Sequence, residues 1–192
     1  MIRRVANLVL LVVAVALCYG MQTSTPHYAR LTGPIPVRGG IGDTIEARSF
    51  SLKVAKIGFA QTLKLNAFGR EKVLTTGGLW AIVTAELAAR DASTSVWGGM
   101  WRGPGGLRYH TTERLGVVRS APPFFLEPGL PTKVRFVFEI PADQAADATL
   151  LVASARFSAL DSEAQIKLGT VETGTDGLPA GVIETFDLDQ PI

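Results

Sequence analysis

The residues best suited to chemistry are two tryptophans and their polar neighbours, which surround a glycine-rich loop. Trp97 and Trp101 are followed closely by Arg102, Arg108 and Tyr109. Trp, Tyr and Arg are the residue types that anchor most interfaces, and a tryptophan face beside an arginine can also stack on a sugar. These five residues are therefore the candidate binding site. The alternative is that one or both tryptophans fill the end of a core, because large aromatics also dominate core burial.

Catalytic and metal-binding patterns are weak by comparison. His110 and Glu113 could orient one another near a serine, but a catalytic triad needs several converging groups. The single cysteine, Cys18, lies in a hydrophobic segment, and the sequence has neither a His-x-x-x-His pair nor a calcium-loop pattern. Residues 98–106 lack the Lys-Ser/Thr ending of a phosphate loop. We therefore predict no catalytic residue, no metal site and no cofactor, and we predict that the chain is not an enzyme.

The N-terminal segment predicts a membrane helix. Val5–Met21 carries no charge, follows Arg3 and Arg4, and reaches the short end of the length that crosses a bilayer. The positive-inside rule places the N-terminus in the cytoplasm and the remaining chain in the periplasm or outside the cell. Three interpretations stay open: a single-pass anchor in the cytoplasmic membrane, which length and flanks favour, a cleaved signal peptide, or lipidation at Cys18. All three export the same domain.

Charge is distributed unevenly along the chain. From Glu139 to Ile192 the sequence has ten acidic and two basic residues, although the whole chain carries a net charge of +2. A basic first part can favour anionic lipid or polymer surfaces. We favour the simpler interpretation, in which the basic and acidic parts neutralise one another across the fold.

Four segments follow from composition and patterning. Residues 1–21 are the predicted transmembrane helix, and residues 22–43 are a tether rich in Thr, Pro and Gly. Residues 44–186 are the predicted folded domain, and residues 187–192 an acidic tail. A domain of this length can bury a hydrophobic core without disulfide bonds.

The strand pattern is clearest in residues 134–140. One face of this predicted strand is apolar and consists of Val134, Phe136, Phe138 and Ile140. The other face is mixed and consists of Arg135, Val137 and Glu139. Residues 79–88 are apolar on both faces near their start, which is typical of a central strand covered on both sides. In residues 50–59 the apolar positions change face after Val54, which indicates a β-bulge or a corner between sheets.

These patterns together predict the fold class. Pro128-Gly129 is the preferred central pair of a type II turn, and turn signals of this kind separate about seven short strands. Trp80 lies early in the predicted central strand, as in an immunoglobulin core. We therefore expect an all-β, immunoglobulin-like β-sandwich of about seven strands, preceded by one N-terminal transmembrane helix.

Five short motifs resemble bacterial exported domains of unknown function that carry an immunoglobulin-like sandwich behind an anchor or lipid attachment. The motifs are Gly39–Thr44, Gly78–Val83, Leu126–Gly129, Val137–Ala142 and Ala148–Val152. The resemblance covers roughly residues 39–157. It implies the fold and an extracytoplasmic setting, and it implies no catalytic residue.

The function that these observations favour is a non-enzymatic, membrane-anchored interaction domain outside the cytoplasm. We expect it to be an accessory subunit of a bacterial envelope assembly, binding a protein partner through a sheet edge or the tryptophan loop. The membrane is contacted through Val5–Met21, and nucleic acid is not among the expected partners. The alternative function is binding of a glycan or cell-wall component through Trp97 and Trp101.

Overall fold

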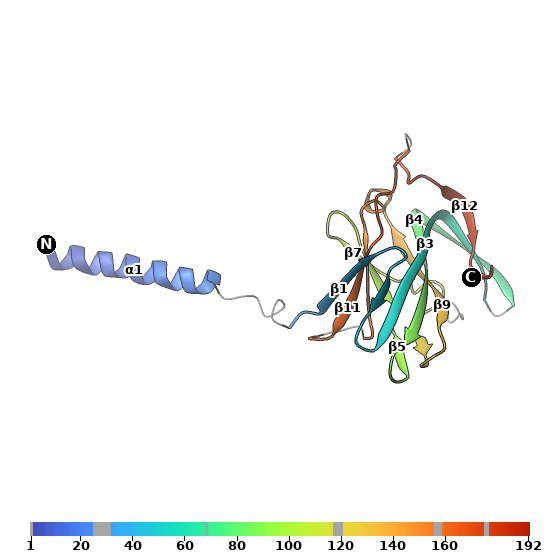
Figure 1. Ribbon diagram of the computed structural model, residues 1–192. Helices are drawn as coiled ribbons and strands as arrows, with labels where there is room; N and C mark the ends of the chain where they lie inside the picture. Colours follow the sequence, from blue (N-terminus) through green and yellow to red (C-terminus); the bar gives the residue numbers. More distant parts are fainter. Residues whose placement is uncertain (1, 25–31, 68, 117–120, 156–158, 175–176) are drawn as a thin grey trace. The chain divides into compact units, whose positions relative to one another are not determined.

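The computed structural model describes residues 2–24, 32–67, 69–116, 121–155, 159–174 and 177–192 (Figure 1). The chain divides into a unit that ends at Gly33 and a compact unit that begins at Pro34, and each is described by itself. The first unit contains helix α1, Ile2–Ser24. None of its residues from Arg3 to Ser24 is buried, and its length and composition would allow it to cross a membrane. The predicted apolar helix is confirmed, whereas its retention in a membrane stays a prediction.

The compact unit consists almost entirely of strands. In chain order they are β1 Ile35–Gly40, β2 Thr44–Glu46, β3 Phe50–Ala67, β4 Arg70–Ala89, β5 Thr94–Val96, β6 Gly99–Arg102, β7 Arg108–His110, β8 Phe124–Leu126, β9 Thr132–Ile140, β10 Thr149–Ala153, β11 Ser162–Lys167 and β12 Val182–Asp187, with the short 3-10 helix η1 Ala142–Gln144 before β10. Sheet A has the order β1-β11-β10-β6-β7. Sheet B has the order β12-β3-β4-β9, with β2 paired to β3, and β5 and β8 form a separate ribbon.

The two main sheets pack face to face around one hydrophobic core. Sheet B contributes Phe59 and Phe138, sheet A contributes Trp101, Leu150 and Ile166, and all five side chains are buried. The predicted β-sandwich behind an N-terminal apolar helix is therefore confirmed. The described residues contain more strands than the seven expected. Four of the strands, β2, β5, β7 and β8, have only three residues each. Such short strands are difficult to separate from turns in a sequence.

Sheet B is covered on both faces, as the apolar pattern of residues 79–88 predicts. Ala81 and Val83 in β4 face the core between the sheets, whereas Trp80 and Ile82 belong to a second cluster on the opposite face. The alternation predicted for β9 is confirmed, since Val134, Phe136, Phe138 and Ile140 face the core and Val137 faces the second cluster. Two later segments cover that second cluster through Leu115 and Leu188, which are 2% and 3% exposed.

The expected position of the core tryptophan is wrong. Trp80 points to the outer face of sheet B, where the guanidinium carbon of Arg114 lies 5.1 Å from its ring centroid. Because Leu79 and Ala81 both face the core, the residue between them must face away from it. Trp101 of sheet A fills the core between the sheets instead.

Strand β3 contains the irregularity that its sequence predicts. Its pairing with β4 shifts between Val54 and Lys56, which marks a β-bulge. Phe50, Leu52 and Val54 before this shift and Phe59 after it all face the same core. The extra residue therefore restores the apolar side chains to the inner face, and the strand stays in sheet B rather than turning a corner.

Both ends of the compact unit extend beyond the predicted domain boundaries. Ile35–Gly40, expected in the tether, is strand β1, which pairs in parallel with β11. Extended segments that contain proline suit the edge of a sheet, where a missing N–H is tolerated. The expected acidic tail, residues 187–192, starts in β12 and continues along sheet B, with Leu188 buried. Residues 25–31 of the expected tether lie outside the described residues.

Strand β4 passes so close to β9 that Gly78 has no room for a side chain. A Cβ atom there would lie 2.3 Å from the carbonyl oxygen of Ile140 and 3.0 Å from its carbonyl carbon. Both are backbone atoms, so an added methyl group must displace a strand. We expect Gly78→Ala to lower the free energy of unfolding by about 2 kcal/mol, measured by urea denaturation of the full chain in detergent.

Gly77 supplies the matched control for this substitution. A Cβ at Gly77 meets no atom within 4 Å. We expect Gly77→Ala to change the free energy of unfolding by no more than about 0.5 kcal/mol. Equal denaturation midpoints for the two variants would contradict the close approach of β4 and β9.

Candidate functional site

The outer face of sheet A is the candidate site, and strand alternation decides which side chains it presents. Trp101, Leu150 and Ile166 face the core, so their chain neighbours Arg102 and Lys167 point to the outer face. Arg38 reaches the same face from β1, because its neighbour Val37 packs against the core. The outer face thus carries these polar side chains from β1, β6 and β11, together with the apolar side chains of Leu151 in β10 and Met100 in β6.

Strand pairing places several of these residues in one row across the sheet. Gly40 of β1 is opposite Lys167 of β11, and Lys167 is opposite Thr149 of β10. Thr149 is opposite Arg102 of β6, which is opposite Arg108 of β7. We call Lys167, Arg102 and Arg108 the basic row. Because adjacent strands lie about 4.8 Å apart, Arg102 and Arg108 are near neighbours and Lys167 is about 10 Å from Arg102.

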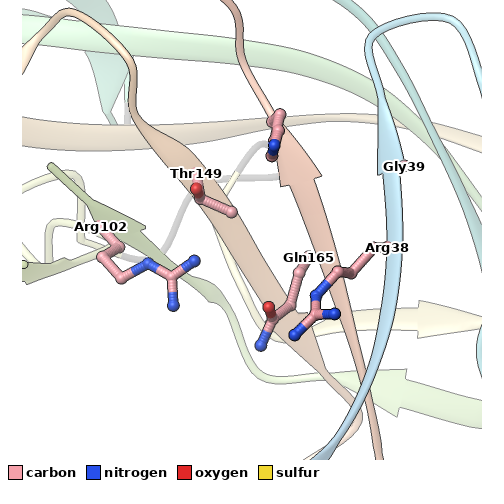
Figure 2. Close-up of a pocket in the computed structure, with 6 residues that line it drawn as sticks. Arg38, Gly39, Arg102, Thr149 and Gln165 are labelled. Carbon is pink, nitrogen blue, oxygen red and sulfur yellow. The ribbon is translucent and has the colours of Figure 1, made fainter. Parts of the chain in front are cut away.

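A hollow lies over this part of the sheet. It has a volume of about 300 Å³ and is lined by Arg38, Gly39, Arg102, Thr149, Gln165 and Lys167. Figure 2 shows Arg38 and Arg102 extending toward the hollow from opposite sides, with Thr149 and Gln165 between them. Arg38 and Lys167 are exposed, whereas Arg102, Thr149 and Gln165 are half-buried. The hollow is therefore open to solvent and rich in hydrogen-bond donors.

The cations of this face have no carboxylate partner in the part of the chain that the structure describes. No salt bridge within the described residues involves Arg38 or any member of the basic row. The acidic side chain on the same face of β11 is Glu163, which is 7% exposed and accepts a hydrogen bond from Gln165 Nε2 at 2.8 Å. Acidic and basic parts of the chain do meet elsewhere, as in Arg48–Asp161 and Arg114–Glu139. The neutralisation expected from the sequence is thus incomplete around the hollow, where three cations lie without a salt bridge to any described residue.

The structure separates the five binding residues that the sequence suggests. Arg102 lines the hollow and Arg108 continues the basic row. Tyr109 lies between two outward residues of β7 and packs against the core instead. Trp97 follows β5, outside sheet A, and is 49% exposed.

The assignment of Trp101 to a recognition surface is wrong. Its side chain is 0% exposed, and its indole N–H donates to the carbonyl oxygen of Gln144 at 2.8 Å. Strand alternation is again the reason, since Trp101 and Arg102 are consecutive and must point to opposite faces. The alternative expectation, that a tryptophan fills the core, is confirmed for Trp101.

Sequence reasoning missed four residues that line the hollow: Arg38, Thr149, Gln165 and Lys167. Arg38 fell within the expected tether, and Gln165 and Lys167 lay in a stretch with a weak strand pattern. The available signal was the alternation of Gln165 and Lys167 with the buried Ala164 and Ile166. That signal locates each side chain on a face, but it does not reveal that β1 and β11 are neighbours.

The candidates for catalysis remain apart from the hollow. His110 is exposed on β7, opposite Met100 of β6, and Glu113 follows beyond the end of that strand. Within the described ranges, no group of three His, Cys, Asp or Glu side chains is placed to hold a metal ion. The expectation that the chain is not an enzyme stays a prediction.

Comparisons with known proteins identify similar folds only. No family model matches the chain, and no curated protein matches it. Three solved structures are similar to it. An uncharacterised β-sandwich protein from Clostridium difficile has 13% identity, covering 70% of this chain and 95% of that one, with a TM-score of 0.44. The yjhA protein of Bacillus subtilis has 14% identity, covering 67% and 98%, with a TM-score of 0.47. The secreted protein MPT63 of Mycobacterium tuberculosis has 12% identity, covering 69% and 98%, with a TM-score of 0.48.

Proposed function

We propose that this chain is a non-enzymatic binding domain, anchored to the cytoplasmic membrane by α1 and folded outside the cytoplasm. Support comes from α1, whose apolar side chains are exposed throughout. Burying such a surface in a bilayer is favourable, and the helix satisfies its own backbone hydrogen bonds there. Arg3 and Arg4 lie at the end that the positive-inside rule keeps in the cytoplasm.

The observation that carries the binding role is the group of cations around the hollow, for which the described part of the chain supplies no salt-bridge partner. Like charges gathered on one face repel one another and reduce the stability of the folded domain. Other basic residues of the domain, such as Arg48 and Arg114, are paired with carboxylates. The unpaired set on sheet A is best explained by a component of the cell envelope that supplies anionic groups. The anchor would raise the effective concentration of the domain near such a partner.

Glycan binding by two tryptophans has less support from the structure. Trp101 has no exposed surface, so Trp97 is left without its expected companion. A single half-exposed tryptophan offers one stacking platform rather than two. The proposed binding site is therefore the hollow on sheet A. The protein partner expected from the sequence is one kind of envelope component that can supply the anionic groups.

A thiol placed in the hollow tests location and binding together. The variant is Thr149→Cys in a Cys18→Ser background, because Cys18 is the chain's own cysteine. We expect a membrane-impermeant thiol reagent to label it in intact spheroplasts, since the domain lies outside the cytoplasm. We also expect a photo-crosslinker attached to this thiol to yield a covalent adduct with an envelope component, detected by gel electrophoresis.

Lys56→Cys in the same background is the matched control. Lys56 is exposed on β3 of sheet B, away from the hollow. It should be labelled equally by the impermeant reagent but should give no partner adduct. Labelling that requires permeabilised cells would refute the location. Equal adducts from both positions, or none from position 149, would refute the binding face.

A further inference from the structure

We propose that the hollow on sheet A binds a phosphate ester, with the phosphate group held between Arg38 and Arg102. This inference rests on the proposed binding role of the same face and adds the chemical class of the ligand. Its starting point is the pair of guanidinium groups that approach one hollow from β1 and β6 (Figure 2). Guanidinium groups bind phosphate and carboxylate in a two-pronged geometry that fixes orientation as well as charge.

Most of the polar side-chain groups that line the hollow are hydrogen-bond donors. Arg38, Arg102 and Lys167 carry no acceptor, and the hydroxyl of Thr149 can donate as well. Gln165 Nε2 already donates to Glu163, which leaves one of its two N–H groups for a ligand. A ligand that satisfies this set must be rich in acceptor oxygens and negatively charged.

The number and placement of the cations favour phosphate over carboxylate. A carboxylate has two oxygens, which a single guanidinium group can occupy. A phosphate monoester has three oxygens free of the ester bond and a charge of about −1.5 to −2 at neutral pH. It can therefore accept from Arg38 and Arg102 together and still interact with Lys167. A single carboxylate paired with one arginine has no oxygen left for a two-pronged contact with the arginine on the other side of the hollow.

The size of the hollow leaves room for the remainder of the ester. A volume of about 300 Å³ matches the lower end of small-molecule sites, and it exceeds the roughly 30 Å³ that one water molecule occupies in the liquid. Arg108 lies one strand beyond Arg102 and extends the positive potential past the hollow. Glu163 limits the site on the opposite side, because its carboxylate repels an anion placed next to Gln165.

Calorimetric titration of the full chain in an uncharged detergent tests the inference with glycerol phosphate and glycerate as probes. We expect saturable binding of glycerol phosphate and at least about tenfold weaker binding of glycerate, because only the phosphate engages both arginines. Arg38→Gln and Arg102→Gln should each weaken glycerol phosphate binding by about tenfold or more. Equal affinity for the two probes, or no binding of glycerol phosphate, would overturn the inference.

Two further variants separate the site from general charge. Lys53→Gln removes a cation on sheet B, where Lys53 is exposed opposite Glu86, and should leave binding unchanged. Arg108→Gln removes a cation of the same face outside the hollow and should weaken binding by only about twofold to threefold. Equal losses in all four variants would show a diffuse electrostatic effect and refute a defined phosphate site. Denaturation midpoints confirm that each variant is folded.

Competition distinguishes the two sources of the phosphate group. One arm adds poly(glycerol phosphate) and the other adds phosphatidylglycerol to the detergent micelles, at equal phosphate concentration. Displacement of glycerol phosphate in the first arm identifies a soluble polymer, and displacement in the second identifies a lipid headgroup. Displacement in neither arm would count against the inference. If the phosphate probe fails while position 149 still captures a partner, the ligand class is wrong but the proposed function stands.

Discussion

Replacing Trp101 by alanine is expected to lower the free energy of unfolding by about 3–5 kcal/mol, the usual range for removing a buried tryptophan. The side chain has no exposed surface. Its ring packs edge-on against Phe59 at a centroid distance of 6.1 Å and lies 5.8 Å from the ring of Phe138. The substitution removes contacts between the two sheets and leaves the carbonyl of Gln144 without the indole donor.

Urea denaturation of the full chain in detergent measures this effect. Two other variants serve as comparisons. Trp97→Ala should change the free energy of unfolding by less than about 0.5 kcal/mol, because Trp97 is half-exposed. Trp101→Phe keeps most of the ring volume but loses the N–H donor, so it should fall between the wild type and Trp101→Ala. Similar small effects for Trp97→Ala and Trp101→Ala would mean that Trp101 is not a core residue.

Arg135 is expected to be the second most sensitive position. It is 4% exposed on the outer face of β9, where its guanidinium group donates to the carbonyl oxygens of Leu188 at 2.8 Å and Pro191 at 3.2 Å. Phe186 lies beside it, with its ring centroid 5.4 Å from the guanidinium carbon. Burial lowers the pKa of the Arg135 guanidinium below its usual value, and the nearby Asp187 offsets only part of this effect. One buried cation thus holds the C-terminal segment, residues 186–192, against sheet B.

We expect Arg135→Met to lower the free energy of unfolding by about 2 kcal/mol, because the buried carbonyl group of Leu188 and the part-buried one of Pro191 lose a charged donor. Methionine keeps an unbranched apolar stem and removes the guanidinium group, so the effect reports mainly on the contacts of that group with Leu188, Pro191 and Phe186. Hydrogen exchange gives a local measure. The N–H of Leu188 donates to the carbonyl of Lys64 at 2.8 Å, and its exchange should accelerate when the segment is released.

Lys133→Met is the matched control on the same strand and the same face. Its ammonium group lies 3.3 Å from a carbonyl oxygen of Ile192, but the residue is exposed. The free energy of unfolding should therefore change by no more than about 0.5 kcal/mol. Unchanged exchange of the Leu188 amide in Arg135→Met would show that the C-terminal segment is held by its other contacts. The segment would then behave more like the free tail that its composition suggests.

Local patterns in the sequence were sufficient for the main features of the sandwich. The inward face of β9, the double coverage of β4 and the bulge in β3 all follow from side-chain alternation, which a strand imposes on itself. The turn at Pro128-Gly129 is confirmed as well, with Gly129 at a φ of 75° and the N–H of Leu130 bonded to Glu127. These features depend on residues that are neighbours along the chain.

The candidate site was only partly predictable for the same reason. The sequence indicates Arg102 and Arg108, because they lie beside the tryptophans. It does not indicate Arg38 and Lys167, since their place in the hollow depends on the parallel pairing of β1 with β11. Those strands lie far apart along the chain, and no spacing of residues encodes which of them become neighbours. Packing of the two sheets decides the pairing, because each strand must bury its own apolar face.

By itself, the sequence determined an apolar N-terminal helix, an all-β domain and the faces of its longest strands. Alternation along a strand is a local property of the backbone, so it can be recognised in the sequence without knowledge of the fold. Only the tertiary structure decided that Trp101 is buried, that Arg135 holds the C-terminal segment, and that cations from three strands surround one hollow. These outcomes depend on contacts between segments that are distant along the chain. Such contacts form only when the whole domain is packed.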